Sequence, residues 1–190
     1  MIKLEYPFDE AAVRKLRAGD SVLLSGKVFT GRDRFHKYLA DGGECPLQMR
    51  DAALFHCGPV MVPDGDTWRV VAAGPTTSIR EEPYEAATIE KLGLRVIIGK
   101  GGMGPATVEA CRRFGCVYLQ AVGGAAALIA DRVVKVAGVS FLDEFGATEA
   151  VWEFEFENLE AVVGIDANGG DIFAATRETS SKALGRLTGK

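Results

Sequence analysis

The chain has 190 residues, of which 47% are hydrophobic and 25% are charged, so it is long enough to bury a substantial core. Its formal net charge of −4, without a block of Lys or Arg, argues against nucleic acid as a partner, because phosphate binding needs a clustered basic surface. No apolar run approaches the roughly 20 residues of a membrane span, and residues 1–6 lack the apolar core of a signal peptide. We therefore expect one cytoplasmic domain over residues 1–190.

A short strand and a helix are predicted over residues 4–17, and strand-like and helix-like stretches then alternate through the middle of the chain. Apolar, strand-like runs occupy residues 21–29, 52–57, 68–73, 94–98, 116–120 and 132–136. Helices are predicted at residues 33–39, 84–92, 105–114 and 123–130.

The last third of the chain has a different pattern. Residues 152–157 alternate Trp or Phe with Glu, which is typical of a strand with one apolar face and one acidic face. We expect the acidic face to be solvated, with a partner surface as the alternative. A further strand is predicted at residues 161–165 and a terminal helix at 174–187. Alternation in the middle and added strands at both ends indicate an α/β domain with a mixed sheet and flanking helices.

A glycine-rich turn, residues 99–104 (GKGGMG), lies between a predicted strand and a predicted helix. This context and Lys100 predict an anion site, because backbone N–H groups and the positive end of the helix dipole face such a turn. A dinucleotide site would need an acidic residue after the next strand, which instead ends at Gln120, and a P-loop would need Ser or Thr after Lys100. A phosphate, a carboxylate or tight packing alone remain as interpretations of the turn.

A second candidate segment follows the strand predicted at residues 68–73. Thr76, Thr77 and Ser78 provide three consecutive hydroxyls, and Arg80 can bind a carboxylate through two parallel hydrogen bonds. The same hydroxyls can equally cap the next helix, with Arg80 in solvent.

Arg32 follows the strand predicted at residues 21–29, just past a glycine. Taken alone, it is more simply interpreted as a surface residue of a turn. Arg32, Arg80 and Lys100 together have a different meaning, because three strands each place a cation just beyond their C-terminal ends, where α/β sheets bind ligands. A small substrate with two carboxylates would use such a set.

The histidines and cysteines give weaker signals. We expect His36 on the surface of its helix, whereas His56, beside a Gly-Pro turn, can either line a site or serve packing. The cysteines lack the C-x-x-C spacing of zinc or redox sites, so we expect small, partly buried free thiols and no metal cluster held by this chain alone. They are Cys45, Cys57, Cys111 and Cys116.

Three of these segments carry a family resemblance. Residues 27–37, 74–80 and 99–103 resemble class I fumarate hydratase, and more narrowly its C-terminal domain or the β subunit of two-subunit fumarases and L-tartrate dehydratases. Residues 166–173 (DANGGDIF) resemble the C-terminal stretch of that family. The match runs in order from about residue 19 to 173, and several motifs in order are far more specific than any one of them.

The resemblance implies a swivelling β/β/α-type domain with a mixed central sheet and flanking helices. It implies a hydro-lyase that reversibly hydrates fumarate to L-malate, with a [4Fe–4S] cluster bound by a partner α subunit and not by this chain. The open iron of that cluster would act as a Lewis acid on the substrate. Further homo- or hetero-oligomerisation is also implied, and the isolated chain is expected to be inactive and colourless.

The resemblance also assigns roles by motif. Arg32, Arg80 and Lys100 would bind the dicarboxylate, with Lys100 counted among the catalytic groups. Thr76 would accept the proton from the carbon next to a carboxylate, and Thr77 would lie beside it in the substrate site. Fixed cations can stabilise the charge that develops on that carboxylate, although a threonine hydroxyl needs nearby cations or a proton relay to act as a base.

Other functions are compatible with parts of the pattern. The nearest is an L(+)-tartrate dehydratase β subunit, which converts tartrate to oxaloacetate and which composition and spacing do not separate from a fumarase. More distant are an oxidoreductase that binds a dinucleotide at residues 99–104 and a non-catalytic anion-binding module.

Overall fold

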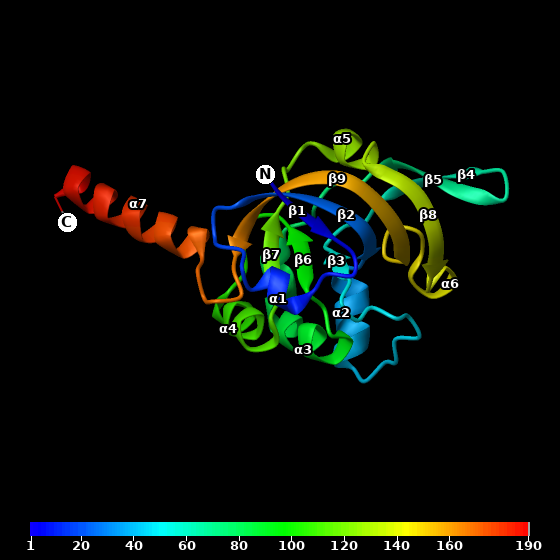
Figure 1. Ribbon diagram of the computed structural model, residues 1–190, viewed down its shortest axis with the longest axis horizontal. Helices are drawn as coiled ribbons and strands as arrows, with labels where there is room; N and C mark the ends of the chain where they lie inside the picture. The colour runs from blue at the N-terminus through cyan, green and yellow to red at the C-terminus, as the bar shows by residue number, and fades with distance from the viewer. Residues whose placement is uncertain (190) are drawn as a thin grey trace.

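The computed structural model, which describes residues 1–189, is built on a mixed seven-stranded sheet with the order β1–β2–β3–β6–β7–β9–β8 (Figure 1). The strands of this sheet are β1 (Ile2–Glu5), β2 (Ser21–Thr30), β3 (Ala53–Phe55), β6 (Val96–Gly99), β7 (Val117–Gln120), β8 (Val133–Ser140) and β9 (Val151–Ile165). A separate antiparallel hairpin contains β4 (Val60–Asp64) and β5 (Thr67–Ala72).

Five strands of the large sheet close on themselves. β2, β3, β6 and β7 pair in parallel, and β9 runs antiparallel to both β7 and β2. The long, curved β9 therefore joins the two ends of the parallel set into a barrel-like sheet (Figure 1). Because parallel neighbours require crossover connections, the links between these strands carry helices.

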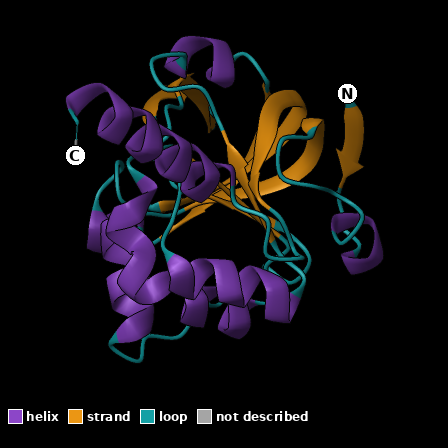
Figure 2. Cartoon of the chain, turned by 90° about the vertical axis from the view of Figure 1, so that its left-hand side faces the viewer, coloured by secondary structure: helices purple, strands orange, loops and turns teal. Residues whose placement is uncertain are grey.

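The helices are α1 (Glu10–Val13), α2 (Asp33–Ala40), the 3₁₀ turn η1 (Ser78–Glu81), α3 (Glu82–Leu92), α4 (Pro105–Phe114), α5 (Ala126–Ala130), α6 (Leu142–Phe145) and α7 (Ile172–Thr188). α2, α3 and α4 lie side by side against one side of the sheet (Figures 1 and 2). α7 projects away from the body of the chain, and none of its described residues is buried (Figure 1). None of the described helices is long and apolar enough to cross a membrane.

The parallel strands are buried on both faces, and successive residues contribute to two different cores. Val96 and Ile98 of β6 face the interior of the barrel, whereas Ile97 between them packs under the helix layer. Leu119 and Tyr118 of β7 divide in the same way. This alternation follows from the two-residue period of a strand, and it explains why these strands read as continuous apolar runs.

The mixed α/β class, the mixed sheet and the flanking helices are confirmed. The prediction of two separate strands at residues 152–157 and 161–165 is wrong, because β9 is continuous across both. Asn158 adopts a positive φ of 53° near a register irregularity in the pairing with β2, so the strand bends there without ending. The helix expected to extend toward residue 17 ends at Val13, after which Lys15 and Leu16 donate to carbonyls only three residues back.

Of the acidic residues of β9, Glu157 is exposed as expected, whereas Glu153 and Glu155 are only partly exposed. Trp152, Phe154 and Phe156 are buried, as the alternating pattern predicts. Glu153 is half-buried and pairs with Lys27 at 2.6 Å. Glu155 faces Lys135 of β8 at 3.8 Å.

Candidate functional site

The predicted site residues lie on loops at the C-terminal ends of the parallel strands. Arg32 follows β2 and Lys100 follows β6, while His56 comes directly after β3, which lies between those two strands. The loop after β2 is tied to β3 by a hydrogen bond from the Gly31 N–H to the Phe55 carbonyl, at 3.0 Å. The carboxyl ends of adjacent parallel strands meet at one edge of a sheet, which places these residues together.

Thr76 and Thr77 extend this edge, although they follow the hairpin strand β5. The Thr76 N–H donates to the His56 carbonyl at 2.7 Å, and Thr77 forms a parallel bridge with Lys100. Ser78 holds Lys100 twice, through its N–H to the Lys100 carbonyl and through its Oγ to the Lys100 N–H, each at 3.1 Å. The Thr76–Thr77 segment is therefore held between the ends of β3 and β6.

The guanidinium of Arg32 is paired with a carboxylate of this chain. Its Nε and Nη2 atoms both lie 2.6 Å from Oε1 of Glu149, and Glu149 Oε2 also accepts from the Arg34 N–H at 3.1 Å. Arg32 reaches across Gly58, where a Cβ atom would lie 2.8 Å from Nη1. Gly58 follows Cys57, which bridges Pro75, so Arg32 lies close to the segment that carries Thr76.

Arg80 is half-exposed and pairs with Asp33 at the start of α2. Lys100 differs from both arginines, because it forms no ion pair with any residue of the described range 1–189. Its side chain is half-buried and passes over Gly123, where a Cβ atom would lie 3.4 Å from the Lys100 Cδ. Of the three predicted cations, Lys100 therefore brings the positive charge that no described carboxylate neutralises.

The glycine turn does not present a free helix N-terminus, which corrects the helix-dipole part of the anion site predicted there and leaves the part of Lys100 as a prediction. The carboxylate of Glu82 occupies the start of α4: Oε2 accepts from the Gly104 N–H at 2.7 Å, and Oε1 accepts from the Ala106 N–H at 2.9 Å. The Thr107 hydroxyl adds a 2.6 Å bond to the same carboxylate. The positive end of the helix dipole is thus already compensated by an acidic side chain of the neighbouring helix α3.

The glycines of the turn allow close approaches. A Cβ at Gly99 would lie 1.8 Å from Ser78 Oγ, so only glycine lets Ser78 reach the Lys100 N–H. Gly102 has a φ of +81° and lies under the ring of Phe173, which would be 2.6 Å from a Cβ there. The segment at residues 166–173 therefore packs against the turn, and Asp171 of that segment caps α7.

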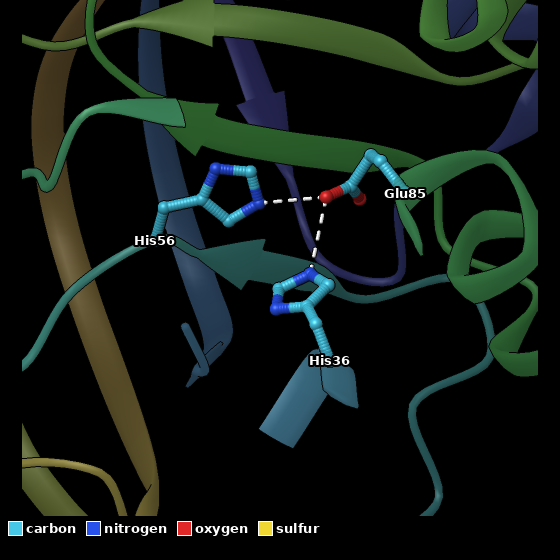
Figure 3. Close-up of side chains that lie close together, drawn as sticks. All are labelled: His36, His56 and Glu85. Atoms are coloured by element: carbon cyan, nitrogen blue, oxygen red, sulfur yellow. Dashed lines mark hydrogen bonds and ion pairs between the residues drawn. The ribbon is translucent and has the colours of Figure 1, made fainter. Parts of the chain in front are cut away.

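A buried polar cluster, consisting of His36, His56, Glu85 and Ser78, lies directly beneath this edge. Figure 3 shows the first three of these side chains. Glu85 Oε2 lies 2.9 Å from His56 Nε2 and 3.1 Å from His36 Nε2. His56 Nδ1 lies 3.0 Å from Ser78 Oγ, which also accepts from the Tyr118 hydroxyl at 3.0 Å. All four residues of the cluster are 0% exposed, so each polar contact counts.

The partners of these atoms determine where the protons lie. His36 Nδ1 is 2.9 Å from the Arg32 carbonyl, which can only accept, so Nδ1 carries a proton. Burial alone would lower the pKa of His36, but the carboxylates of Glu85 and Glu81 raise it. His36 is thus an imidazolium that donates from both ring nitrogens.

His56 has the opposite protonation state. Burial lowers the pKa of His56, which keeps this ring neutral with its proton on Nε2, toward Glu85. Its unprotonated Nδ1 accepts from the Ser78 hydroxyl. Ser78 then donates once and accepts twice, from the Lys100 N–H and the Tyr118 hydroxyl, which uses its full hydrogen-bonding capacity.

A second buried carboxyl lies beside the cluster. Burial raises the pKa of Glu81 to about 7, although nearby His36 opposes this shift. Neither carboxyl oxygen of Glu81 has a hydrogen-bond partner among the described residues, and its Oε2 lies 3.5 Å from His36 Nδ1. Glu85 Oε1 likewise has no partner within residues 1–189.

The expected surface position of His36 is wrong, since the ring is fully buried. His56, which the sequence left open, is a buried member of the cluster, and Glu85 was not predicted as a site residue. A signal for the buried carboxyls exists in α3 and the preceding turn. Glu81 and Glu85 are four residues apart and share the inner helix face with buried Ile89, so they interrupt a helical apolar pattern.

The residues of the described chain do not form a cysteine site for an iron–sulfur cluster. Cys57, Cys111 and Cys116 are buried, and all four cysteines are free thiols. Burial raises the pKa of the Cys57 thiol, which disfavours the thiolate that a metal requires. Within residues 1–189, the side chains close enough to share a metal are His36, His56 and Glu85, and these already satisfy one another through protons.

Comparison with known proteins gives consistent matches. A family model described as "Fumarase C-terminus" matches residues 1–176. The chain is 43% identical over 188 residues to a putative fumarate hydratase class I of Geobacillus stearothermophilus, with 98% of this chain and 36% of that protein covered. It therefore spans about a third of that relative's length.

Two further relatives are separate subunits. A putative L(+)-tartrate dehydratase subunit beta of Methanocaldococcus jannaschii is 37% identical over 194 residues, with 98% of this chain and 100% of the relative covered. The L(+)-tartrate dehydratase subunit beta of Escherichia coli is 33% identical over 177 residues, with 92% and 88% covered.

Proposed function

Because this chain belongs to the fumarase C-terminus family, we propose that it is the β subunit of an iron–sulfur hydro-lyase that interconverts fumarate and L-malate. Residues 1–190 would act as one domain of the swivelling β/β/α class that closes on a partner α subunit. The observation that carries this proposal is the convergence of Arg32, Thr76 and Lys100 at one edge of the parallel strands, where Lys100 has no carboxylate partner among the described residues.

The cations at this edge would hold the two carboxylates of the substrate. Lys100 offers a charge that can pair with a substrate carboxylate without breaking an internal ion pair. Arg32 is held in place by Glu149, and Arg80 by Asp33, so each arginine can add hydrogen bonds from nitrogens directed away from its internal partner. Thr77, which bridges Lys100, would form part of the same surface.

The proton transfer would involve Thr76. In the direction from malate to fumarate, the Thr76 hydroxyl would accept a proton from the carbon next to a carboxylate, while the hydroxyl group leaves the neighbouring carbon. Negative charge would then develop on that carboxylate, where fixed cations stabilise it without having to reorganise. Lys100 would also favour a less protonated Thr76 hydroxyl, since an ordinary threonine is far too weak an acid to act as a base at neutral pH.

The [4Fe–4S] cluster would be bound by the partner subunit. Three of the four cysteines of this chain are buried, and burial raises the pKa of the Cys57 thiol, which does not fit a [4Fe–4S] group, so we assign that cluster to the α subunit. This chain would then supply substrate-binding cations and a proton acceptor at the face that meets the partner. Alone, it would be colourless and inactive.

A second candidate is the β subunit of an L(+)-tartrate dehydratase, with the same chemistry on a more hydroxylated diacid. Two relatives with this name support it, because the chain is 37% identical to the M. jannaschii subunit and 33% identical to the E. coli subunit. The higher identity to the fumarate hydratase relative favours the first candidate.

The two candidates are separated by one reconstitution. The chain is co-purified with its α subunit, treated anaerobically with iron and sulfide, and supplied in turn with fumarate, L-malate and L(+)-tartrate. Faster turnover of fumarate and malate supports the fumarase assignment. Turnover of tartrate without malate transfers the assignment to tartrate dehydratase, and no turnover of any of them refutes both.

A further inference from the structure

We propose that the buried cluster of His36, His56, Glu85 and Ser78 is a positioning device that sets the relative placement of Arg32, Thr76 and Lys100, an inference that rests on the proposed function of this edge. The cluster touches no solvent, so its members are positioning residues and do not contact substrate.

Each of the three proposed substrate residues is bound through its main chain to a different member of the cluster. The Arg32 carbonyl accepts from His36 Nδ1 at 2.9 Å. The Thr76 N–H donates to the His56 carbonyl at 2.7 Å, and the Lys100 N–H donates to Ser78 Oγ at 3.1 Å. Backbone contacts of this kind fix a loop and leave the side chain free for a ligand.

Glu85 connects the cluster residues that form these three main-chain hydrogen bonds. Its Oε2 is shared by His36 and His56, whose rings meet edge to face with centroids 5.2 Å apart (Figure 3). His56 Nδ1 then accepts from the Ser78 hydroxyl. A change at Glu85 is therefore transmitted to loops that follow β2, β3 and β6. The Arg32 carbonyl also accepts from the main-chain N–H of His36 at 3.1 Å within α2, whereas the contacts of Thr76 and Lys100 join segments far apart in sequence, where local chain geometry cannot replace the cluster.

The positions of the protons give each hydrogen bond of the cluster a fixed donor and a fixed acceptor. His36 donates from both nitrogens, His56 donates to Glu85 and accepts from Ser78, and Ser78 accepts from Lys100 and Tyr118. No member can rotate without leaving a buried donor or acceptor unpaired, which costs about 1–3 kcal/mol for each group. Catalysis is sensitive to such constraints, because a displacement of about 1 Å in a positioned group can cost on the order of 100-fold in rate.

Two variants test the proposal in the reconstituted complex. Glu85→Gln removes the shared charge, and Ser78→Ala removes the hydroxyl that accepts from the Lys100 N–H and donates to His56. We expect each to lower kcat at least about 10-fold and to raise KM for the dicarboxylate several-fold, since the cations move relative to the carboxylates. Loss of folded protein alone would lower the apparent kcat and leave KM unchanged. Tyr118→Phe removes a single bond to Ser78 and is the milder variant if either of the others fails to fold; for it we expect an about 2- to 5-fold rise in KM.

The control is Ser25→Ala, which deletes a hydroxyl that accepts from the Asn158 N–H at 3.0 Å far from the edge, and which we expect to keep wild-type kcat and KM. Nitrogen-15 NMR of the histidine rings in the wild-type full chain adds a readout that does not depend on activity. We expect two protonated nitrogens on His36 and one, Nε2, on His56 at neutral pH.

The outcomes separate this inference from the proposed function. If the wild-type complex is active and Lys100→Ala is not, but all cluster variants keep wild-type kcat and KM, the positioning proposal is overturned and the function stands. Absence of either ring proton of His36, or stoichiometric Zn²⁺ bound with loss of the ring N–H signals, would also overturn it. If the complex hydrates no diacid, the proposed function fails, whereas the NMR states still report on the cluster.

Discussion

Glu149 binds the guanidinium of Arg32 at 2.6 Å through two nitrogens and thereby connects the start of β9 to the loop after β2. The pair is mostly buried, with 15% of the Glu149 side chain and 26% of the Arg32 side chain exposed. A substrate carboxylate at Arg32 would meet a guanidinium whose orientation is already determined.

Replacing Glu149 with Gln should weaken the enzyme because Arg32 loses the acceptor that orients it. We expect kcat/KM for the dicarboxylate to fall about 10-fold, mainly through a higher KM, since a charge-assisted pair of this kind is worth roughly 1.5–3 kcal/mol. The matched control is Glu155→Gln, whose carboxylate faces Lys135 at 3.8 Å on β8. Equal kinetics for the two variants would show that Glu149 does not position Arg32.

Gly99 should tolerate no side chain. A Cβ atom would lie 1.8 Å from Ser78 Oγ, so Gly99→Ala must displace Ser78 from Lys100. We expect a loss of about 1–3 kcal/mol in the free energy of unfolding, measured by urea denaturation of the full chain. Gly138→Ala is the control, because a Cβ there meets nothing within 4 Å, and a similar loss in both variants would rule out the packing explanation.

Glu82 should stabilise α4. Glu82→Ala leaves the N–H groups of Gly104, Ala106 and Thr107 without their acceptor, which we expect to cost about 1–2 kcal/mol of unfolding free energy. Glu109→Ala removes an exposed carboxylate paired with Arg112 on the same helix and should leave the unfolding free energy nearly unchanged, because water screens such a pair. If the Glu82 variant is as stable as wild type, the helix start is not capped by this carboxylate.

The capping by Glu82 illustrates what the sequence could not predict. The order of strands and helices follows from hydrophobic periodicity, and the gathering of Arg32 and Lys100 follows from their positions after parallel strands. The carboxylates that compensate the start of α4 and the charge of Arg32 cannot be predicted in this way. Glu82 reaches α4 only because α3 packs beside it, and Glu149 is 117 residues away from Arg32.

The buried histidines show the same limit. A single His in a short predicted helix is interpreted as a surface residue, and the burial of His36 depends on Glu85, which faces its charge from another helix. The residue pattern of one helix does not indicate which side chain of another helix will pair with it. The two glutamates on the inner face of η1 and α3 were the available signal, and their meaning depends on the partners that the fold brings to them.

Glu81 should make stability depend on pH. Its pKa in the folded chain is raised to about 7, above the ordinary value of 4.5, so its contribution to stability is complete below about pH 4.5 and is lost as pH rises through 7. The charged groups that face it are His36, Asp33, Glu85 and Arg80.

The measurement compares wild type with Glu81→Gln by urea denaturation at pH 5 and pH 8. Wild type should lose on the order of 1–3 kcal/mol of unfolding free energy relative to the variant over this interval. In wild type the unfolded chain releases the Glu81 proton more readily than the folded chain, whereas the Gln variant has no proton to release at this position. Parallel pH dependences would mean that Glu81 has an ordinary pKa.

The central claim is that Lys100 brings the free positive charge of a dicarboxylate site formed by this chain. Its most direct test is the steady-state kinetics of the reconstituted α–β complex carrying Lys100→Ala, with Lys182→Ala of the projecting helix α7 as the matched control. The account predicts a loss of at least about 100-fold in kcat/KM for fumarate or tartrate, whichever is the substrate, and wild-type kinetics for the control. Wild-type kinetics for Lys100→Ala in an active complex would contradict it.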